Sequence, residues 1–205
     1  KSQEFEVLLM LANFLYLARR LEKAQEVFDQ CEALNKAQSE SSIPLQALFL
    51  KTRGTLLFNQ QKIGEAIQCF ESSAEICLKT GDRTLHVANI NNIAYAYLLT
   101  GNLVAARQKL MDALDYAREI NEPQLQALIQ SNLGLILLME GQTDRGHEMT
   151  NSAIDLLEQN GLTVDSSGQN IEQIRFYRDV FAQMRRIEGE EFTFPARGAL
   201  LLLLR

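Results

Sequence analysis

A pattern of small residues recurs along this chain at a spacing of 40 to 42 positions, and this repetition constrains the fold more than any other feature of the sequence. One small residue marks each copy, at Ala12, Gly54, Ala94 and Gly134. A second small residue follows twelve positions later, at Ala24, Ala66, Ala106 and Gly146. Two registers of small residues in four successive copies indicate a tandem repeat of one structural unit.

Each copy has the pattern of two helices. Apolar residues recur at three- and four-residue spacing, as in Ile90, Ile93 and Tyr97, and breakers such as Gly101-Asn102 separate the segments. The pattern predicts helices over residues 4–18, 22–36, 45–59, 63–79, 84–99, 103–119, 124–140 and 144–159, and a ninth over 170–187. The alternation typical of a β-strand does not continue beyond a few positions, so the predicted fold class is all-α.

The helices group into one predicted repeat domain over residues 1–187. The helix pairs are expected at about 4–37, 45–80, 84–120 and 124–160, followed by a capping helix at 170–187. Residues 38–44 are expected to form the longest connection, which explains the offset of 42 between the first two copies. Residues 188–205 follow as a C-terminal tail, and the start at Lys1 rather than Met suggests a fragment of a longer protein.

With the registers placed, the sequence resembles the tetratricopeptide repeat (TPR) family. The resemblance is carried on first helices by Leu133-Gly134-x-x-Leu137 and Ile93-Ala94-x-x-Tyr97, and on second helices by Ala24-x-x-x-Phe28 and Ala66-x-x-x-Phe70. The sequence departs from the family pattern because no Trp opens a repeat, Arg53 stands where Leu is usual, and the period is 40 rather than about 34. Lengthened repeats of this kind are similar to those of kinesin light chains, the scaffold LGN, and Rap- and PlcR-type peptide receptors.

The resemblance implies a right-handed α-solenoid of four helix pairs and a capping helix, in which the first helices line a concave groove. It also implies that this groove binds a peptide segment of a partner protein. The groove residues expected from it are Asn13, Tyr16, Lys51, Thr55, Phe58, Asn91, Asn92, Tyr95, Leu98, Ser131, Asn132 and Leu135.

These residues combine aromatic and aliphatic groups with amides and hydroxyls. An Asn side chain can donate to and accept from a peptide backbone, whereas the apolar groups would supply most of the binding energy. Two alternatives stay open: Leu98 packs between repeats, and Asn91, Asn92 and Asn132 are solvated or bond to loops. Only Lys51 and Asn92 could take part in a carboxylate clamp, so the expected ligand is an apolar or amphipathic segment.

The expected function is a non-catalytic scaffold or adaptor module that holds a partner's peptide within a larger assembly. The alternative is a ligand-gated TPR regulator, a peptide receptor whose effector domain lies outside this fragment. No enzyme activity, cofactor or metal is expected, because His86 and His147 are interpreted as separate surface residues and no glycine-rich phosphate loop occurs.

Charge and apolar runs limit the kinds of partner. A net charge of −6 disfavours binding to nucleic acid, and the longest apolar run, residues 199–204, is too short to span a bilayer. Cys31, Cys69 and Cys77 lack metal or disulfide spacing, which favours a reducing, intracellular and cytoplasmic location. The five leucines at 200–204 would promote association if exposed, so the tail is expected to fold back onto a groove, to mediate self-association, or to be a remnant of a longer protein.

Ala106 is expected to face Ala94 across one helix pair, at a point where only small side chains let two helices approach closely. We expect Ala106→Leu to lower the free energy of unfolding by about 1–3 kcal/mol, because the larger side chain forces the helices apart. Thermal unfolding of the variant beside the parent chain measures this loss. An unchanged melting temperature would show that the register of small residues is wrong.

Overall fold

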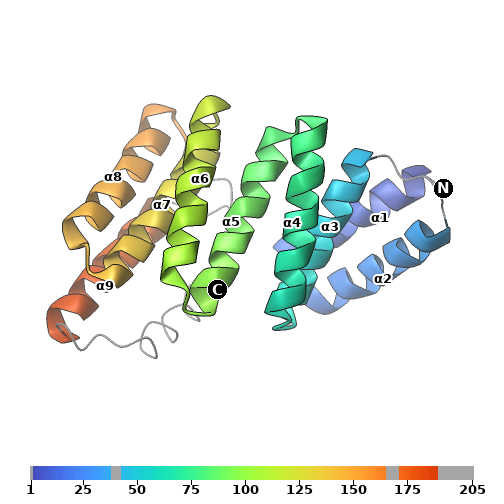
Figure 1. The fold of residues 1–205 in the computed structure, drawn as a ribbon, viewed down its shortest axis with the longest axis horizontal. Helices are drawn as coiled ribbons and strands as arrows, with labels where there is room; N and C mark the ends of the chain where they lie inside the picture. Colours follow the sequence, from blue (N-terminus) through green and yellow to red (C-terminus); the bar gives the residue numbers. More distant parts are fainter. Residues whose placement is uncertain (1, 38–42, 165–170, 189–205) are drawn as a thin grey trace. The chain divides into compact units, whose positions relative to one another are not determined.

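The computed structural model describes residues 2–37, 43–164 and 171–188. Within these ranges the chain forms helices joined by short turns, and no extended β-strand occurs there (Figure 1). The helices are α1 (Ser2–Leu17), α2 (Leu21–Ala37), α3 (Ile43–Asn59), α4 (Ile63–Thr80), α5 (Arg83–Leu99), α6 (Leu103–Glu119), α7 (Pro123–Glu140), α8 (Thr143–Gln159) and α9 (Ile171–Glu188). The all-α prediction is confirmed.

The predicted helix bounds lie within two residues of the observed ones. The starts of α1 and α3 differ most, by two residues each, and α3 begins at Ile43, so that Pro44 lies in its first turn. A proline is tolerated there because the backbone N–H that it lacks would have no partner within the helix. The predicted loop over 38–44 was therefore too long by two residues, and residues 38–42 and the tail from 189 onward lie outside the described residues.

Each helix pair turns at a residue in the left-handed backbone conformation. Arg19, Gln61, Gly101 and Gly141 have φ values of 59°, 64°, 82° and 87°. After each of them the next N–H donates to a carbonyl five residues back, as from Gln142 to Leu137 over 2.9 Å. This bond closes the C-terminus of the first helix. The four turns are spaced by 42, 40 and 40 positions, so the turn follows the same period as the small residues.

Contacts group the chain into two compact units, Lys1–Asn89 and Ile90–Arg205, and each is described by itself. In the first unit α1 packs on α2 and α3 packs on α4. Its core includes three aromatic rings, in which Phe49 lies 5.0 Å from Phe28 and 5.9 Å from Phe5 between ring centroids. The single domain over 1–187 stays a prediction.

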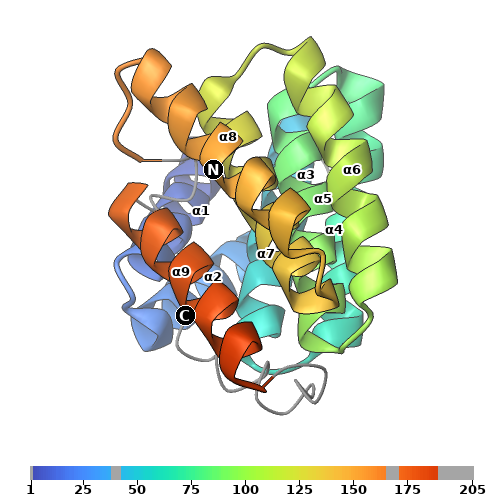
Figure 2. The ribbon, with the colours of Figure 1, turned by 90° about the vertical axis from the view of Figure 1, so that its left-hand side faces the viewer.

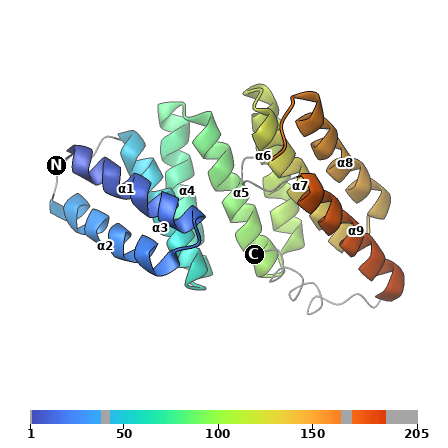
Figure 3. The same cartoon turned by 180° about the vertical axis from the view of Figure 1, so that it is seen from behind.

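In the second unit α7 is the central helix and packs against α6, α8 and α9. Most of α7 from Leu125 to Met139 is buried, with little distinction between faces. Helix α9 lies across α7 and α8, where Ile174 joins a core with Ala127 and Leu157 (Figures 2 and 3). Helix α9 therefore covers an apolar surface of the last helix pair.

The two registers of small residues lie where the helices of a pair meet. A Cβ atom on Gly134 would lie 2.5 Å from Thr150 Cγ2 and 3.0 Å from the backbone oxygen of Gly146. A Cβ atom on Gly54 would lie 2.7 Å from the ring of Phe70. Ala24 and Ala66 at the other register are fully buried. The helices approach so closely at these points that only the smallest residues fit.

We expect Gly134→Ala to destabilise the protein even though alanine favours a helix over glycine by about 1 kcal/mol. The added methyl group meets a backbone oxygen and Thr150, whose rotamer is held by the hydrogen bond from Oγ1 to Gly146 O (3.0 Å). Overpacking of this kind costs about 1–3 kcal/mol, which outweighs the gain in propensity.

The matched control is Gly64→Ala in α4, where the added methyl group meets nothing within 4 Å. This change is expected to be neutral or to stabilise by up to about 1 kcal/mol. Urea unfolding of both variants at equal m-value measures the difference. Equal stabilities of the two variants would contradict the close approach at Gly134.

Candidate functional site

In the first unit, the predicted groove residues lie half-buried on the first helices α1 and α3. They are Asn13, Tyr16, Lys51, Thr55 and Phe58. The hydroxyl of Thr55 donates to the carbonyl of Lys51 over 2.9 Å, so it is used within its own helix. Burial lowers the pKa of the Lys51 ammonium, since the charged form loses hydration.

In the second unit, the predicted residues divide into half-buried and buried groups. Asn91, Asn92, Tyr95 and Asn132 are half-buried, whereas Leu98, Ser131 and Leu135 are buried. The Ser131 hydroxyl donates to the carbonyl of Leu128 over 2.9 Å. The buried residues offer little surface to a ligand. For Leu98 this agrees with the alternative that it packs between repeats.

Asn91 on α5 and Asn132 on α7 join the two first helices of the second unit. The Nδ2 group of Asn132 donates to Oδ1 of Asn91 over 2.9 Å. Among the described residues this leaves the oxygen of Asn132 and the amide nitrogen of Asn91 without another hydrogen bond. One acceptor and one donor side by side match the donor and acceptor of a peptide group. This pair is the most ligand-like arrangement that sequence analysis predicted, although the pairing itself was not foreseen.

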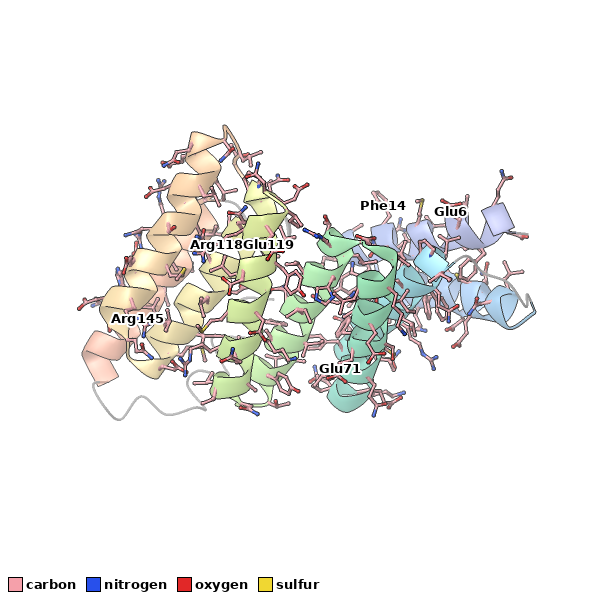
Figure 4. All side chains as sticks on the ribbon, turned by 45° about the horizontal axis from the view of Figure 1, so that its top comes forward. Glu6, Phe14, Glu71, Arg118, Glu119 and Arg145 are labelled. Carbon is pink, nitrogen blue, oxygen red and sulfur yellow. The ribbon has the colours of Figure 1, made fainter. Side chains whose placement is uncertain are left out.

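A groove on the second-helix side of the second unit was not predicted. It holds about 440 Å³ between α6 and α8, and Leu133 and Leu137 of α7 form its floor. Two methionines, Met111 and Met149, stand on its opposite walls. Figure 4 shows that two arginines of the walls, Arg118 and Arg145, come from α6 and α8.

A chain of polar contacts closes one end of this groove. Arg107 pairs with Glu140 over 3.2 Å, Gln142 donates to the other oxygen of Glu140 over 2.9 Å, and Arg145 donates to Gln142. Further along, Gln130 is only 7% exposed and donates to Ser152 over 3.1 Å, while its Oε1 has no partner among the described residues. The groove thus combines an apolar floor with an unpaired buried acceptor.

The same register in the first unit is closed. A hollow of only about 120 Å³ lies between α2 and α3, where Arg53 pairs with Glu32 over 3.5 Å. These positions correspond to Leu133 and Leu114 in the second unit. Comparing the residues at one register across the copies is the signal that could have pointed to the groove, since the charged pair Glu32–Arg53 is replaced there by Leu114 and Leu133.

Comparisons with known proteins agree with this arrangement of helices. No protein-family model matches the chain. The tetratricopeptide repeat protein 19 homolog, mitochondrial, of Drosophila melanogaster is 30% identical over 90 residues. The match spans 43% of this chain and 24% of that relative, so the chain corresponds to about a quarter of its length.

Two solved structures resemble the whole chain. A kinesin light chain-like protein of Podosopora anserina with TPR-like repeats is 16% identical, covers 100% of this chain and 99% of its own, and has a TM-score of 0.65. The chain has a TPR-like fold. The Rap conjugation gene regulator of plasmid pLS20, solved with the Phr* peptide, is 15% identical with a TM-score of 0.65, over 98% of this chain and 58% of its own. At these identities the likeness concerns the fold.

The histidines of this TPR-like chain do not form a site. His86 was predicted on the surface but is buried, with Nδ1 3.1 Å from the carbonyl of Ala74, so that prediction was wrong. It belongs to a buried polar ladder in which Asn89 donates to Ser73 over 2.8 Å. His147 is half-buried, and the described residues contain no group of three or more side chains that could hold a metal ion.

The arginines of α9 connect this helix to α8. Arg175 pairs with Glu158 over 2.8 Å and with Glu172 over 2.7 Å. Arg178 bonds to Asp179 over 2.7 Å and also donates to Asn151 of α8. Arg175 and Arg178 are thus paired with carboxylate and amide groups of the same chain. None of the described helices has both the length and the apolar character needed to cross a membrane.

The cysteines are free thiols within the helices. Burial raises the pKa of Cys31 and of Cys77 from 9.0 to about 11, and it also raises the pKa of the half-buried Cys69. A thiol with a raised pKa stays protonated and unreactive at neutral pH.

We expect Cys31 and Cys77 of the native protein to resist a thiol reagent at pH 8 and to react once urea unfolds the chain. Because their pKa is higher in the folded state, the unfolded chain releases its thiol protons first, and stability should fall as pH rises from 9 to about 11. Mass spectrometry of labelled native and unfolded protein measures reactivity at each site. Rapid labelling of Cys31 in the native state would contradict its burial.

Proposed function

We propose that this chain is a non-catalytic interaction module that binds a peptide segment of a partner protein on its first-helix face. The observation that carries the proposal is the Asn91–Asn132 pair, with its free donor and acceptor beside Asn92 and Tyr95 on α5. The two amides can bond one peptide group, and an aromatic side chain can cover an apolar residue of the ligand.

The fold supports the proposal. The Rap regulator with a similar fold was solved with a bound peptide. In TPR-like arrays the first helices of successive repeats present adjacent surfaces, so an extended or helical segment can contact several repeats at once. The half-buried residues of α1 and α3 offer a similar mixture of amide, hydroxyl and aromatic groups in the first unit.

The alternative function is a ligand-gated regulator in which a small peptide alters the packing of the repeats and thereby an effector domain. The likeness to the Rap regulator favours this reading. Scattering curves of the complete protein with and without its peptide separate the two functions, because a regulator changes its dimensions on binding and an adaptor keeps them.

The proposal includes a reducing, intracellular compartment, which the three free thiols support. The cytoplasm stays the predicted compartment. The related Drosophila protein is named mitochondrial, so fractionation of cells into cytosol and mitochondria is the measurement that decides.

We expect the double variant Asn92→Ala and Tyr95→Ala to weaken peptide binding at least about tenfold. The peptide is first mapped by pull-down with the complete protein and overlapping fragments of the captured partner. Titration calorimetry then compares the parent chain and the variant. Both residues are half-buried, so the melting temperature should change little and the loss reflects the ligand contact.

The matched control, Tyr116→Ala with Asn151→Ala, removes the same two side-chain types from the exposed surface of the second helices α6 and α8. This control is expected to bind as the parent chain does. Binding that survives the first-helix changes but is lost in the control would overturn the proposal and assign the ligand to the outer surface of the second helices.

A further inference from the structure

The first helix exposes a continuous apolar stripe. Val7, Met10, Leu11 and Phe14 are 62%, 55%, 41% and 67% exposed. Their spacing of three, four and seven places them on one face of α1. Figure 4 shows Phe14 projecting from this helix, with Glu6 nearer its start. An apolar stripe of this size on a single helix usually marks a contact surface.

Equivalent positions in the other repeats show which kind of element packs on this face. The same positions on α3, 42 residues later, are Phe49, Thr52, Arg53 and Leu56. Helix α2 contacts two of them: Phe28 stacks on Phe49 at 5.0 Å and Glu32 pairs with Arg53 at 3.5 Å. The stripe of α1 is therefore the face on which the preceding helix stacks in an internal repeat.

The second unit repeats this arrangement. The equivalent positions on α7 are Ile129, Asn132, Leu133 and Ile136. The three apolar residues are buried, whereas Asn132, which matches Met10, is half-buried at the edge of this face and bonds to Asn91 of α5. Helix α6 packs there in the opposite direction, since its start meets the end of α7 at Arg107–Glu140 and its end meets the start of α7 at Gln126–Ala117. This face of a first helix thus accepts an antiparallel helix.

The charges along α1 indicate which antiparallel helix fits. Between residues 2 and 17 the charged side chains are Glu4 and Glu6, both in the first half. Lys1 precedes them, and Arg19 and Arg20 follow just beyond the end. A second copy of α1 placed antiparallel brings its basic end to the acidic end of the first. A parallel placement would oppose like charges.

We propose that the stripe of α1 is the interface of a two-fold symmetric dimer, in which α1 packs antiparallel on α1 of a second copy. With the axis between Met10 and Leu11, Val7 of one chain lies opposite Phe14 of the other. Arg19 then falls about 3 Å along the helix axis from Glu4 of the second copy, within reach of a long side chain. A two-fold axis uses the same surface twice and closes the assembly.

The dimer is tested by sedimentation velocity of the 205-residue chain over a wide range of concentration. We expect a monomer–dimer equilibrium that Phe14→Glu and Met10→Glu each weaken at least about tenfold. Val104→Glu is the matched control, because Val104 is also 67% exposed but the residues three and four positions further along α6 are the polar Arg107 and Gln108. The melting temperature of each variant at low concentration should match that of the parent chain.

Two further variants make the result specific. Leu11→Cys lies next to the two-fold axis, so mild oxidation should give a disulfide-linked dimer that Val104→Cys does not give. Glu4→Arg should weaken the dimer, and adding Arg19→Glu in the same chain should restore it. These measurements use no peptide ligand, so their outcome is independent of whether the proposed peptide binding is correct.

A chain that stays monomeric at all concentrations would overturn the dimer and leave the stripe to another helix. A dimer that persists in Phe14→Glu and Met10→Glu would also overturn it and assign self-association to another segment, such as the leucine-rich tail. Cross-linking of Leu11→Cys and Val104→Cys to the same extent would show that the contact is nonspecific.

Discussion

The close approach of the two helices in each repeat is the contact on which the rest of this structure depends. The backbones come very close at Gly134 and Gly146. A Cβ atom added to either glycine would lie only 3.0 Å from the carbonyl oxygen of the other. With small residues at the crossing, larger side chains of each first helix lie to either side of it. One side presents Asn132 toward α5, and the other carries the apolar positions on which the previous second helix stacks. The positions of the small residues therefore determine which side of each first helix faces the neighbouring first helix and which side faces the previous second helix.

The helices and their turns could be predicted from the sequence because both depend on local rules. The spacing of apolar residues predicts each helix, and the left-handed turn residues recur at the same period. The arrangement of side chains from several helices could not be predicted in this way. His86 looked like a surface residue because its partner, the carbonyl of Ala74, lies on another helix. The Asn91–Asn132 hydrogen bond likewise joins residues 41 positions apart.

One register can carry different chemistry in different repeats without a change of fold. Between α2 and α3, Arg53 and Glu32 fill the hollow with an ion pair. In the second unit Leu133 and Leu114 occupy the same positions, and a groove of about 440 Å³ between α6 and α8 has these leucines beneath charged and polar walls. A partly exposed ion pair contributes little to stability, so its replacement by leucines costs little and opens a surface. The departure of Arg53 from the family pattern is thus a local difference in groove chemistry.

The first and last helices, α1 and α9, differ in the polarity of their outer faces. A capping helix in a repeat array carries a polar outer face. Helix α9 fits this description as far as its side chains are described, since Glu172, Gln173 and Asp179 are exposed and Phe176 is the one exposed large apolar side chain among the described ones. Helix α1 does not, because its outer stripe from Val7 to Phe14 is apolar throughout. The internal helix α3 has the polar residues Thr52 and Arg53 at this register. An apolar side chain such as Phe14 stabilises a helix only when its surface is removed from water. The apolar stripe is therefore understandable only as a surface that another helix covers.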